Sequence, residues 1–531
     1  MTLAPLGGTA APPLRARWLG RVRFNDAHAL QRTLFRNTTD SYLLLLEHHP
    51  VYTVGLRGAL DHLRVPAEDL GADVVATDRG GDVTWHGPGQ LVGYPILSTN
   101  ESPKDYVCAV EQLIIDVCAG LGLPGLGRVA GAPGVWVDPD GPAPRKICAI
   151  GVRRSRGRTM HGFALNVDAD LSWFDRIVPC GIADKGVTSL AAEGVDVTMR
   201  EVVDAVIAAT AARWGFDDVE RADVSWERET PAGMPVATRK PEWLRIKADL
   251  GEGYREVRKT MRSLKLVTVC EEAGCPNIYE CWRDGTATFM INGDRCTRAC
   301  GFCQVDTRKP LAADPEEPER LAEAVAEMGL AHAVITAVAR DDLPDGGAAG
   351  FAESIRAVRR RCPGTAVEVL IPDFKGRPES LETVFDARPD VLNHNLETVA
   401  RLQRHVRPSA SYARSLAVLA RAAAHGLVAK SGLILGMGET EDEVVAAMAD
   451  LQRVGVSILT LGQYLRPSAD HLPVDRWWTP KEFDRLGAAG RALGFAHVEA
   501  SPLTRSSYHA GDDFERMRAA REALLARANA G

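Results

Sequence analysis

Six of the eleven cysteines in this 531-residue chain lie between Cys270 and Cys303, and this clustering constrains the fold more than any other feature. They form two triplets, Cys270, Cys275 and Cys281 in CEEAGCPNIYEC and Cys296, Cys300 and Cys303 in CTRACGFC. In a cytosolic chain, where thiols stay reduced, such a cluster more often binds metal than forms disulfides. We therefore expect this segment to fold around a metal centre.

The spacing of the triplets favours an iron–sulfur cluster over zinc. Structural zinc takes four ligands, commonly as two C-x2-C pairs, which these spacings do not provide. Three thiolates from one short loop can hold three irons of a [4Fe-4S] cluster and leave the fourth iron open. That iron can bind the amino and carboxylate groups of S-adenosylmethionine (SAM). The second triplet, with Phe302 before its last cysteine, resembles the C-x3-C-x2-C signature of radical SAM enzymes.

The chain after the cysteines alternates between strand-like and helix-like segments. We expect strands at 333–338, 366–371, 391–393, 428–435 and 457–461, and helices at 318–328, 350–361 and 441–454. This alternation predicts parallel strands joined by crossover helices, and so a complete or partial (βα) barrel of the TIM type. Catalytic groups would then lie at the carboxyl ends of the strands.

The chain before the cysteines mixes strands and amphipathic helices, so the whole is α/β with two domains. We expect strands at 41–47, 147–152 and 162–167, and helices at 105–119 and 199–213. Residues 215–239 are charged, contain Pro231 and Pro235, and are typical of a linker. The predicted divisions are a flexible tail at 1–16, a first domain at 17–214, this linker, and a second domain at 240–531.

Composition excludes several classes of function. The chain is 45% hydrophobic and 25% charged, with a formal net charge of −7 and no long run of one sign, which argues against non-specific nucleic-acid binding. No apolar stretch reaches the roughly 18–20 residues that span a bilayer. The first twenty residues lack the basic and apolar regions of a secretory signal. We expect a cytoplasmic protein with neither nucleic-acid nor membrane partners.

The second half resembles lipoyl synthase from about Lys240 onward. The resemblance rests on LVTVCEEAGCPNIYECW, CTRACGFC, DDLPDGGA, NHNLETV, GLILGMGET and RSSYHA. It implies that the first triplet holds an auxiliary [4Fe-4S] cluster, with Ser507, rather than Ser506, as its fourth ligand. It also implies a SAM-binding cluster on the second triplet and contacts to SAM from Glu397, Gly436, Gly438 and Glu439. The sequence departs from the pattern of this family at two positions, Ala339 and Arg308, and neither touches a cluster ligand.

The chemistry implied by this resemblance is sulfur insertion. A reduced cluster would cleave SAM to methionine and a 5′-deoxyadenosyl radical, which removes hydrogens from C6 and C8 of an octanoyl chain. The auxiliary cluster would be consumed as the source of sulfur. An electron donor is therefore an expected partner.

The first half resembles the octanoyltransferases of the lipoate–protein ligase B family over about 17–214, through RKICAIGVRRSRG, MHGFALNVDADLSWFDRIVPCGI and DKGVTSL. That family has the biotin/lipoate protein ligase fold, an α+β fold. The Gly-rich RGGDVTWHGPGQ is not a phosphate loop, because it lacks G-K-S/T. Cys180, between a proline and a glycine, is the expected nucleophile, and Lys146 is the cation expected to lower its pKa from about 8.5. Cys108, Cys118, Cys148 and Cys362 are expected to be packing residues.

The resemblance implies a ping-pong acyl transfer from octanoyl-acyl carrier protein, through Cys180, to a lysine of a lipoyl-accepting domain. The accepting domains would be the lipoyl domains of 2-oxoacid dehydrogenase E2 subunits and the glycine cleavage H protein. Residues implied to line the acyl pocket are Arg79, Gly80, Gly81, Asp82, Val83, Thr84, Trp85, His86, Ala149, Ile150, Gly151, Gly162, Phe163 and Ala164. A basic run, Arg153, Arg154, Arg156 and Arg158, could meet the acidic carrier protein or could simply be an exposed hairpin.

Together the halves predict a bifunctional protein-lipoylation enzyme that uses two [4Fe-4S] clusters and SAM. Three alternative functions can each be distinguished from this prediction by one feature. An ATP-dependent lipoate ligase would not need Cys180. A different sulfur-inserting enzyme, such as biotin synthase, would lack CEEAGCPNIYEC. A zinc-stabilised scaffold that only binds lipoyl domains would be colourless and free of iron.

Overall fold

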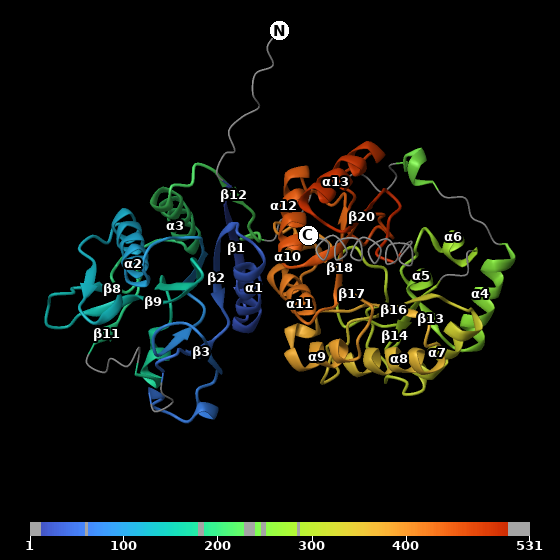
Figure 1. The fold of residues 1–531 in the computed structure, drawn as a ribbon, viewed down its shortest axis with the longest axis horizontal. Helices are drawn as coiled ribbons and strands as arrows, with labels where there is room; N and C mark the ends of the chain where they lie inside the picture. Colours follow the sequence, from blue (N-terminus) through green and yellow to red (C-terminus); the bar gives the residue numbers. More distant parts are fainter. Residues whose placement is uncertain are drawn as a thin grey trace, which may run out of the picture. The chain divides into compact units, whose positions relative to one another are not determined.

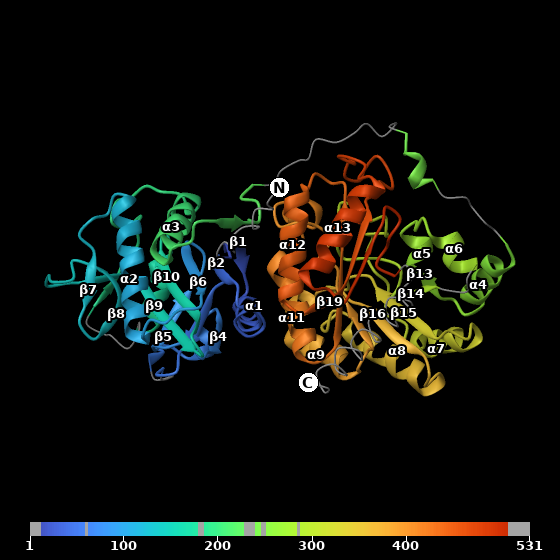
Figure 2. The ribbon, with the colours of Figure 1, turned by 45° about the horizontal axis from the view of Figure 1, so that its top comes forward.

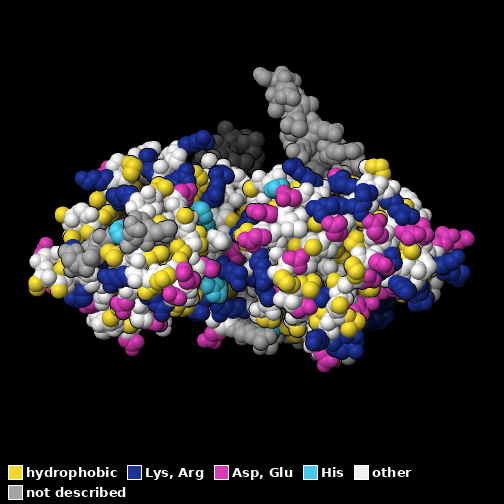
Figure 3. Space-filling view, turned by 90° about the horizontal axis from the view of Figure 1, so that it is seen from below, with side chains coloured by type: hydrophobic (Ala, Val, Ile, Leu, Met, Phe, Trp, Pro, Cys, Tyr) yellow, Lys and Arg dark blue, Asp and Glu magenta, His cyan; other side chains and the backbone are white. Residues whose placement is uncertain are grey.

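The computed structural model describes residues 12–58, 62–178, 185–227, 239–245, 251–283 and 287–507. The chain divides into two compact units, Met1–Trp226 and Glu227–Gly531 (Figure 1). On the face drawn in Figure 3, basic and acidic side chains are interspersed rather than gathered by sign. None of the helices in the described segments is long and apolar enough to cross a bilayer.

The first unit is built on a mixed sheet. Its strands follow the order β12 (Val219–Arg221), β1 (Leu14–Val22), β2 (Ser41–His48), β6 (Gln90–Ile96), β10 (Arg158–Asn166), β9 (Arg145–Ser155), β8 (Ala132–Val137) and β7 (Gly127–Val129). The short β11 (Gly186–Val187) pairs with the start of β9 in parallel. A small second sheet contains β4 (Asp73–Ala76), β3 (Val51–Val54) and β5 (Val83–His86).

Three helices pack on the main sheet. Helix α1 (Phe24–Asn37) lies against β6 and β10, and α2 (Pro103–Gly120) lies beside α3 (Met199–Trp214) and against β8 and β9. Local sequence explains where they begin. Ser102 caps α2, with a proline at its first turn, and Thr198 forms a capping box with Glu201 at the start of α3. A hydrophobic core joins α2 and α3 to the sheet.

The first unit extends further at both ends than predicted. Strand β1 begins at Leu14, inside the predicted tail, and β12 lies inside the predicted linker and pairs with β1 in parallel. The ring of Trp226 stacks on Trp18 with centroids 4.3 Å apart. Charge and proline content suggested a linker, but the edge of the sheet supplies hydrogen bonds and an aromatic contact that hold this segment. The prolines of the predicted linker lie outside the described residues.

The second unit contains an eight-stranded sheet. Its order is β13 (Val267–Thr268), β14 (Thr288–Ile291), β15 (His332–Ala337), β16 (Ala366–Leu370), β17 (Val391–Asn393), β18 (Val428–Leu435), β19 (Val456–Gln463) and β20 (His497–Ala500). All neighbours from β14 to β20 are parallel, and β13 is antiparallel to β14. Within the described residues β13 and β20 do not pair, so the barrel is partial. This confirms the predicted class of fold.

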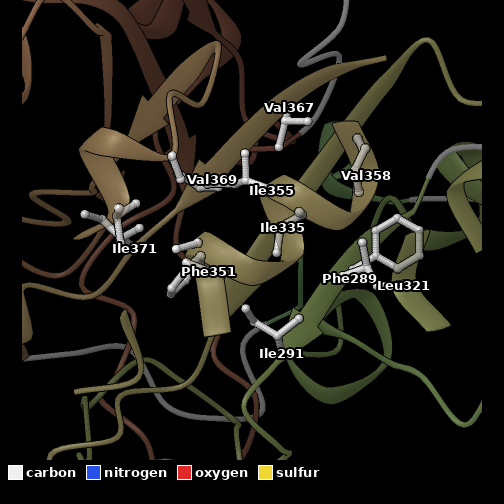
Figure 4. Packing of buried hydrophobic residues seen from close by; sticks show 14 of the residues in the cluster. Phe289, Ile291, Leu321, Ile335, Phe351, Ile355, Val358, Val367, Val369 and Ile371 are labelled. Atoms are coloured by element: carbon white, nitrogen blue, oxygen red, sulfur yellow. The ribbon is translucent and has the colours of Figure 1, made fainter. Parts of the chain in front are cut away.

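Helices follow the parallel strands and cover their outer side (Figure 2). They are α7 (Glu317–Glu327), α8 (Ala348–Arg361), α9 (Pro378–Asp386), α11 (Tyr412–Ala424), α12 (Glu441–Arg453) and α13 (Pro480–Leu493), with α10 (Gln403–Val406) between β17 and α11. Figure 4 shows Phe351 and Ile355 of α8 packed over Ile335 of β15 and Val369 of β16. Three further helices, α4 (Glu252–Ser263), α5 (Val269–Glu272) and α6 (Ile278–Arg283), precede β14, and α5 and α6 carry Cys270 and Cys281.

The inside of the sheet also holds a buried ion pair. Nζ of Lys430 on β18 lies 3.3 Å from a carboxylate oxygen of Glu368 on β16, and both side chains are fully buried. Asn393 of β17 and His332 of β15 lie next to the same carboxylate. Four neighbouring strands are therefore joined by one polar group inside the barrel.

Candidate active sites

The second cysteine triplet occupies one loop at the carboxyl end of β14. The backbone N–H of Cys296 donates to the carbonyl of Asp306 over 2.7 Å, and that of Cys303 donates to Cys300 over 3.1 Å. The N–H of Gly301 donates to Val406, which follows β17. These bonds fold the three cysteines into one loop at the end of the barrel where catalytic groups were expected.

Arg298, between two of these cysteines, anchors the loop to the barrel. Its guanidinium donates two hydrogen bonds of 2.8 Å to Asp341 and one of 2.6 Å to the fully buried Asp373. Burial alone would raise the pKa of Asp373, but the charges of Arg298 and Arg414 hold it well below its usual range. The backbone N–H of Arg298 also points to Sγ of Cys296, 3.4 Å away.

The environment of this triplet fits an iron–sulfur cluster. Burial raises the pKa of Cys300, and it raises that of Cys303 to about 12. A buried thiolate therefore needs a compensating positive charge, which iron supplies on coordination. Soft donors, a largely dry loop and a backbone N–H directed at sulfur are the features expected around such a cluster.

The first triplet lies on the short helices before β14. Cys270 is in α5, which is capped by Thr268, and Cys281 is in α6. The N–H of Cys275 donates to the carbonyl of Cys270 over 3.0 Å. Burial raises the pKa of Cys270 to about 11. All three thiols pack against the core of the second unit, so this triplet is as well suited to a buried cluster as the second one.

The C-terminal segment returns to the first triplet. Nδ2 of Asn277 donates to the carbonyl of Leu503 over 2.8 Å. Burial raises the pKa of the Cys275 thiol, and the charge of Arg505 opposes that rise. Ser506 and Ser507 follow directly and are partly buried. The structure thus brings the predicted serine ligand to the segment that carries the predicted cysteine ligands.

Glu397 lies between the two triplets. Its charge acts on the thiols of Cys300 and Cys303 on one side and on Arg505 on the other. Its backbone is left-handed, with φ of +70°, and its N–H donates to Gly432 over 2.9 Å. Burial raises the pKa of its carboxyl group. A buried carboxylate in this place is well located to meet a cationic ligand.

Glu439 and its glycines form a rigid turn after β18. The carboxylate of Glu439 accepts hydrogen bonds from the N–H groups of Gly436 and Met437 and from Nε1 of Trp478. Gly436 and Gly438 both have φ of +111°, and a Cβ on Gly436 would lie 2.1 Å from Nε2 of Gln463. The carboxylate of Glu439 therefore holds the turn from inside.

The first unit contains a hollow of about 480 Å³, part of which is open to solvent. All the residues predicted for an acyl pocket line it except Gly80, Val83 and Trp85. Val83 and Trp85 point to the opposite side of β5, where they pack in a separate small core. The N–H of Gly80 instead donates to the carbonyl of Val152. These three assignments are corrected by the alternation of the strand and by the turn before it.

Four further residues line the hollow and were missed from the sequence: Phe24, Val92, Tyr94 and His161. Val92 and Tyr94 are at alternate positions along β6. Placing them at the hollow required knowing that β6 is a neighbour of β10. His161 directly precedes the predicted Gly162, and only its position in the MHGFALNV segment marks it. Phe24 begins α1 and has no local signal.

Lys146 is buried near the start of β9. Its Nζ lies 4.7 Å from the centroid of the Trp136 ring, a cation–π distance, and its side chain contacts Gly134. Cys180 lies outside the described residues. The chain is described again from Lys185, and Gly186–Val187 pairs with Arg145–Lys146.

The predicted basic run lies on the β9–β10 hairpin and is largely committed to the fold. Arg158 is buried and donates to the carbonyls of Thr39 and Asp40. Arg153 pairs with Asp78, and Arg154 donates to the carbonyl of Thr99. Arg158 is therefore unavailable to a carrier protein.

Comparison with known families also divides the chain in two, although the model for its second part begins within the last residues of the first unit. The model for the lipoyl protein ligase A/B catalytic domain matches residues 24–211. The model for the N-terminal domain of lipoyl synthase matches residues 217–275, and that for the radical SAM superfamily matches residues 290–451.

Curated relatives match the second half. Lipoyl synthase of Rubrobacter xylanophilus is 58% identical over 290 residues, which are 54% of this chain and 90% of that protein. Lipoyl synthase of Mycobacterium avium is 55% identical over 280 residues, 53% of this chain and 91% of its own. A bipartite lipoate protein ligase structure from Thermoplasma acidophilum aligns with 41% of this chain and 89% of its own at 15% identity and a TM-score of 0.35. The chain belongs to the lipoyl synthase family of radical SAM enzymes through its second half, and residues 24–211 of its first half match the model for the lipoyl protein ligase A/B catalytic domain.

Proposed function

We propose that this one chain performs two consecutive steps on the same lysine of a lipoyl-accepting domain. The first unit attaches an octanoyl group, and the second inserts sulfur at C6 and C8 of that group. The observation that carries the proposal is the union, in one chain, of the hollow in the first unit with the two cysteine triplets. The product of the first step is the substrate of the second.

The first step is a double displacement. The Cys180 thiolate attacks the carbonyl carbon of octanoyl-acyl carrier protein and expels the carrier thiol, which leaves a thioester on Cys180. The amine of the target lysine then attacks this thioester, an amide forms, and the Cys180 thiol is released. Lys146 supports this role because a buried ammonium group stabilises a neighbouring thiolate.

The second step requires groups that the cysteines hold. Cys296, Cys300 and Cys303 would hold the cluster that binds SAM, and Cys270, Cys275, Cys281 and Ser507 would hold the auxiliary cluster. When bound, these clusters and SAM supply the electron, the radical and the sulfur that the reaction needs. Arg298 holds the SAM-side loop in place, and the turn at Gly436 and Gly438 presents its backbone toward the ligand.

Glu397 and Arg505 complete the second site. The Glu397 carboxylate is placed to accept a hydrogen bond from a cationic or hydroxyl group of SAM. Arg505 places a positive charge between Glu397 and Cys275, so the space between the clusters is neither strongly acidic nor strongly basic. An octanoyl chain that enters there meets both predicted clusters.

The proposed partners follow from these steps. They are octanoyl-acyl carrier protein, lipoyl domains of 2-oxoacid dehydrogenase E2 subunits, the glycine cleavage H protein and an electron donor. The proposed compartment is the cytoplasm, because thiolates that hold iron need a reducing environment.

The proposal can be tested with the full chain, purified without oxygen and with its iron restored. An unmodified lipoyl domain is mixed with octanoyl-acyl carrier protein, and its intact mass should rise by one octanoyl group without ATP. Labelling that requires ATP and survives Cys180→Ser would support a lipoate ligase instead. Iron and sulfide should amount to two [4Fe-4S] clusters per chain, and fewer would contradict the dual-cluster assignment.

A further inference from the structure

We propose that His161, which lines the hollow and is backed by Asp78 and His28, forms a polar floor that ends the acyl pocket and excludes chains longer than eight carbons. This inference rests on the proposed octanoyl transfer and adds the residues that set its chain length. Each of the three residues comes from a different segment: His161 from β10, Asp78 from the turn before Arg79, and His28 from α1.

The pairing of β9 with β10 gives the pocket a direction. Ala164 lies opposite Ala149, and His161 lies opposite Val152, three residues further along β9. Lys146 is at the other end, and its Cε lies beside Gly134, which also touches the carbonyl of Cys148. The reacting end of an acyl chain would therefore lie near the level of Ala149, and its methyl end would point toward His161.

The length of this path matches an eight-carbon chain. Three residues of a strand span about 10 Å. Three backbone bonds span about 3.3–3.6 Å when extended, so the seven C–C bonds of an octanoyl group span about 8 Å. The methyl group then ends near Gly151 and Gly162, just before the His161 ring. Two further carbons would reach the ring.

Two glycines allow a close approach of backbone segments in the wall up to this level. A Cβ on Gly162 would lie 2.2 Å from the carbonyl of Gly93, and a Cβ on Gly151 would lie 2.8 Å from that of Gly80. The walls at these two positions are therefore backbone packed on backbone. Side chains resume at His161, so the narrowing there is abrupt.

Hydrogen bonds hold two members of the floor, His161 and Asp78, and His28 packs beside them. Nε2 of His161 donates to the Asp78 carboxylate over 2.7 Å, and the backbone N–H of His161 donates to Gln31 over 3.0 Å. Nε2 of His28 lies 3.3 Å from the same carboxylate oxygen, and the two imidazole rings stack at 5.5 Å. His161 also has a left-handed backbone, with φ of +61°. Few alternative positions are open to its ring.

A second polar pair borders the same end of the pocket. The hydroxyl of Tyr94 lies 2.7 Å from Nε2 of His48, whose Nδ1 contacts the carbonyl of Val22. Burial lowers the pKa of His28 and of His48 to about 4, and it also lowers that of His161. The imidazoles of His161, His28 and His48, at this end of the pocket and behind it, are therefore neutral near pH 7. Their contribution is a neutral, hydrogen-bonded surface that a methyl group can touch but not enter.

This arrangement predicts an asymmetric selectivity. Each CH₂ missing from the chain loses about 0.8 kcal/mol of burial, or about fourfold in kcat/KM, so shorter chains are disfavoured gradually. A longer chain must displace the His161 ring and break its partly buried hydrogen bond to Asp78. Leaving the buried His161 ring without this partner is costly enough to lower kcat/KM at least tenfold. The cut-off above eight carbons should therefore be sharper than the decline below it.

The test compares hexanoyl, octanoyl, decanoyl and dodecanoyl carrier proteins as donors for the full chain. The central variant is His161→Gly, since glycine removes the ring and accepts the left-handed backbone. We expect the decanoyl-to-octanoyl ratio of kcat/KM to rise at least tenfold. His49→Ala, a change at an exposed histidine outside the pocket, should leave the ratio unchanged. Asp78→Asn, which keeps the shape but weakens the hydrogen bond, should raise it less.

The outcomes separate the inference from the function on which it rests. If the wild-type chain transfers no acyl group of any length, the proposed function fails and the floor has no role. If it transfers octanoyl and both His161→Gly and Asp78→Asn keep the wild-type ratio, the floor alone is wrong. If His161→Gly does not fold, Asp78→Asn decides, and an unchanged ratio in that variant overturns the inference.

Discussion

Nδ2 of Asn277 donates a hydrogen bond to the carbonyl oxygen of Leu503 over 2.8 Å and so ties the first cysteine segment to the C-terminal RSSY segment. Arg505 reinforces this link, because its guanidinium lies close enough to Cys275 to act on the pKa of the thiol. The two segments are far apart in the sequence but form one structural site. This contact is the reason to expect a ligand for the first cluster from the C-terminal segment.

Replacing Ser507 should damage the auxiliary cluster alone. In Ser507→Ala the fourth iron of that cluster loses its protein ligand, so we expect its iron to be lost or its spectrum to change while the SAM-side cluster stays intact. Mössbauer and electron paramagnetic resonance spectra after reconstitution measure this. Ser506→Ala is the matched control and should resemble the wild type. The opposite result would assign the ligand to Ser506.

Replacing Arg298 should loosen the loop of the second triplet. Arg298→Met leaves the buried Asp373 with Arg414 as its remaining charged contact, and removing one partner of a buried pair costs about 3–5 kcal/mol. We expect faster loss of iron from the SAM-side cluster, with the cluster absorbance followed over time in a chelator. Arg308→Met, at an exposed arginine, should show wild-type loss. Equal loss of iron in both variants would contradict the role of Arg298 as the anchor of the loop.

The Arg298–Asp373 pair should make the stability of the second unit sensitive to acid. The folded-state pKa of Asp373 is lowered below its unfolded value of about 3.9. Its stabilising contribution is therefore complete above that value and is lost as the pH falls toward the folded-state pKa. In Asp373→Asn this part of the acid dependence should be absent. Unfolding by urea, measured from pH 6 down to about 3, tests this. A free energy of unfolding that falls with pH as steeply in the variant as in the wild type would count against it.

The second unit should be more stable with the buried Lys430–Glu368 pair intact than with one of the two partners removed. Lys430→Met leaves the Glu368 carboxylate buried without its cation and should lower the free energy of unfolding by about 3–5 kcal/mol. The double variant Lys430→Met with Glu368→Leu removes both charges and should recover most of this loss. Thermal unfolding of the three proteins is the measurement. A double variant less stable than the single one would show that the pair is net stabilising.

Cys180 should be the one cysteine of the first unit that transfer requires. Cys180→Ser should abolish octanoyl transfer, because serine at neutral pH is a far weaker nucleophile than a thiolate. Cys108→Ser, at a partly buried cysteine, should keep wild-type transfer. The readout is the rate of octanoyl addition to a lipoyl domain by mass spectrometry. Loss of activity in both variants would remove the assignment.

Local sequence predicted most of the second unit. Strands β17 and β18 have the predicted bounds, and β16 differs only at its end, because apolar runs flanked by turn residues mark buried parallel strands. The six cluster cysteines were visible for the same reason, since their spacing is local. The link between Asn277 and Leu503 was not, because it joins segments that are 226 residues apart in the sequence.

Several features of the first unit could not be predicted from its sequence. The pocket motif around Arg79 was visible, but which of its side chains face the hollow depends on the phase of β5, and so Val83 and Trp85 were misplaced. His161 was missed because a single histidine next to a glycine has no distinctive spacing. The strand β12 was read as linker because its pairing with β1 is non-local and its own composition is charged.

The central claim is that one chain performs both steps, and one experiment tests it most directly. The full chain, with its clusters restored, is incubated with octanoyl-acyl carrier protein, an unmodified lipoyl domain, SAM and a reductant, without ATP. We expect the intact mass of the lipoyl domain to rise first by one octanoyl group and then by two sulfur atoms, because each of two C–H groups becomes a C–SH group and the reductant keeps the product as the dithiol. An octanoyl adduct that never gains sulfur, or a domain that is never acylated, would contradict it.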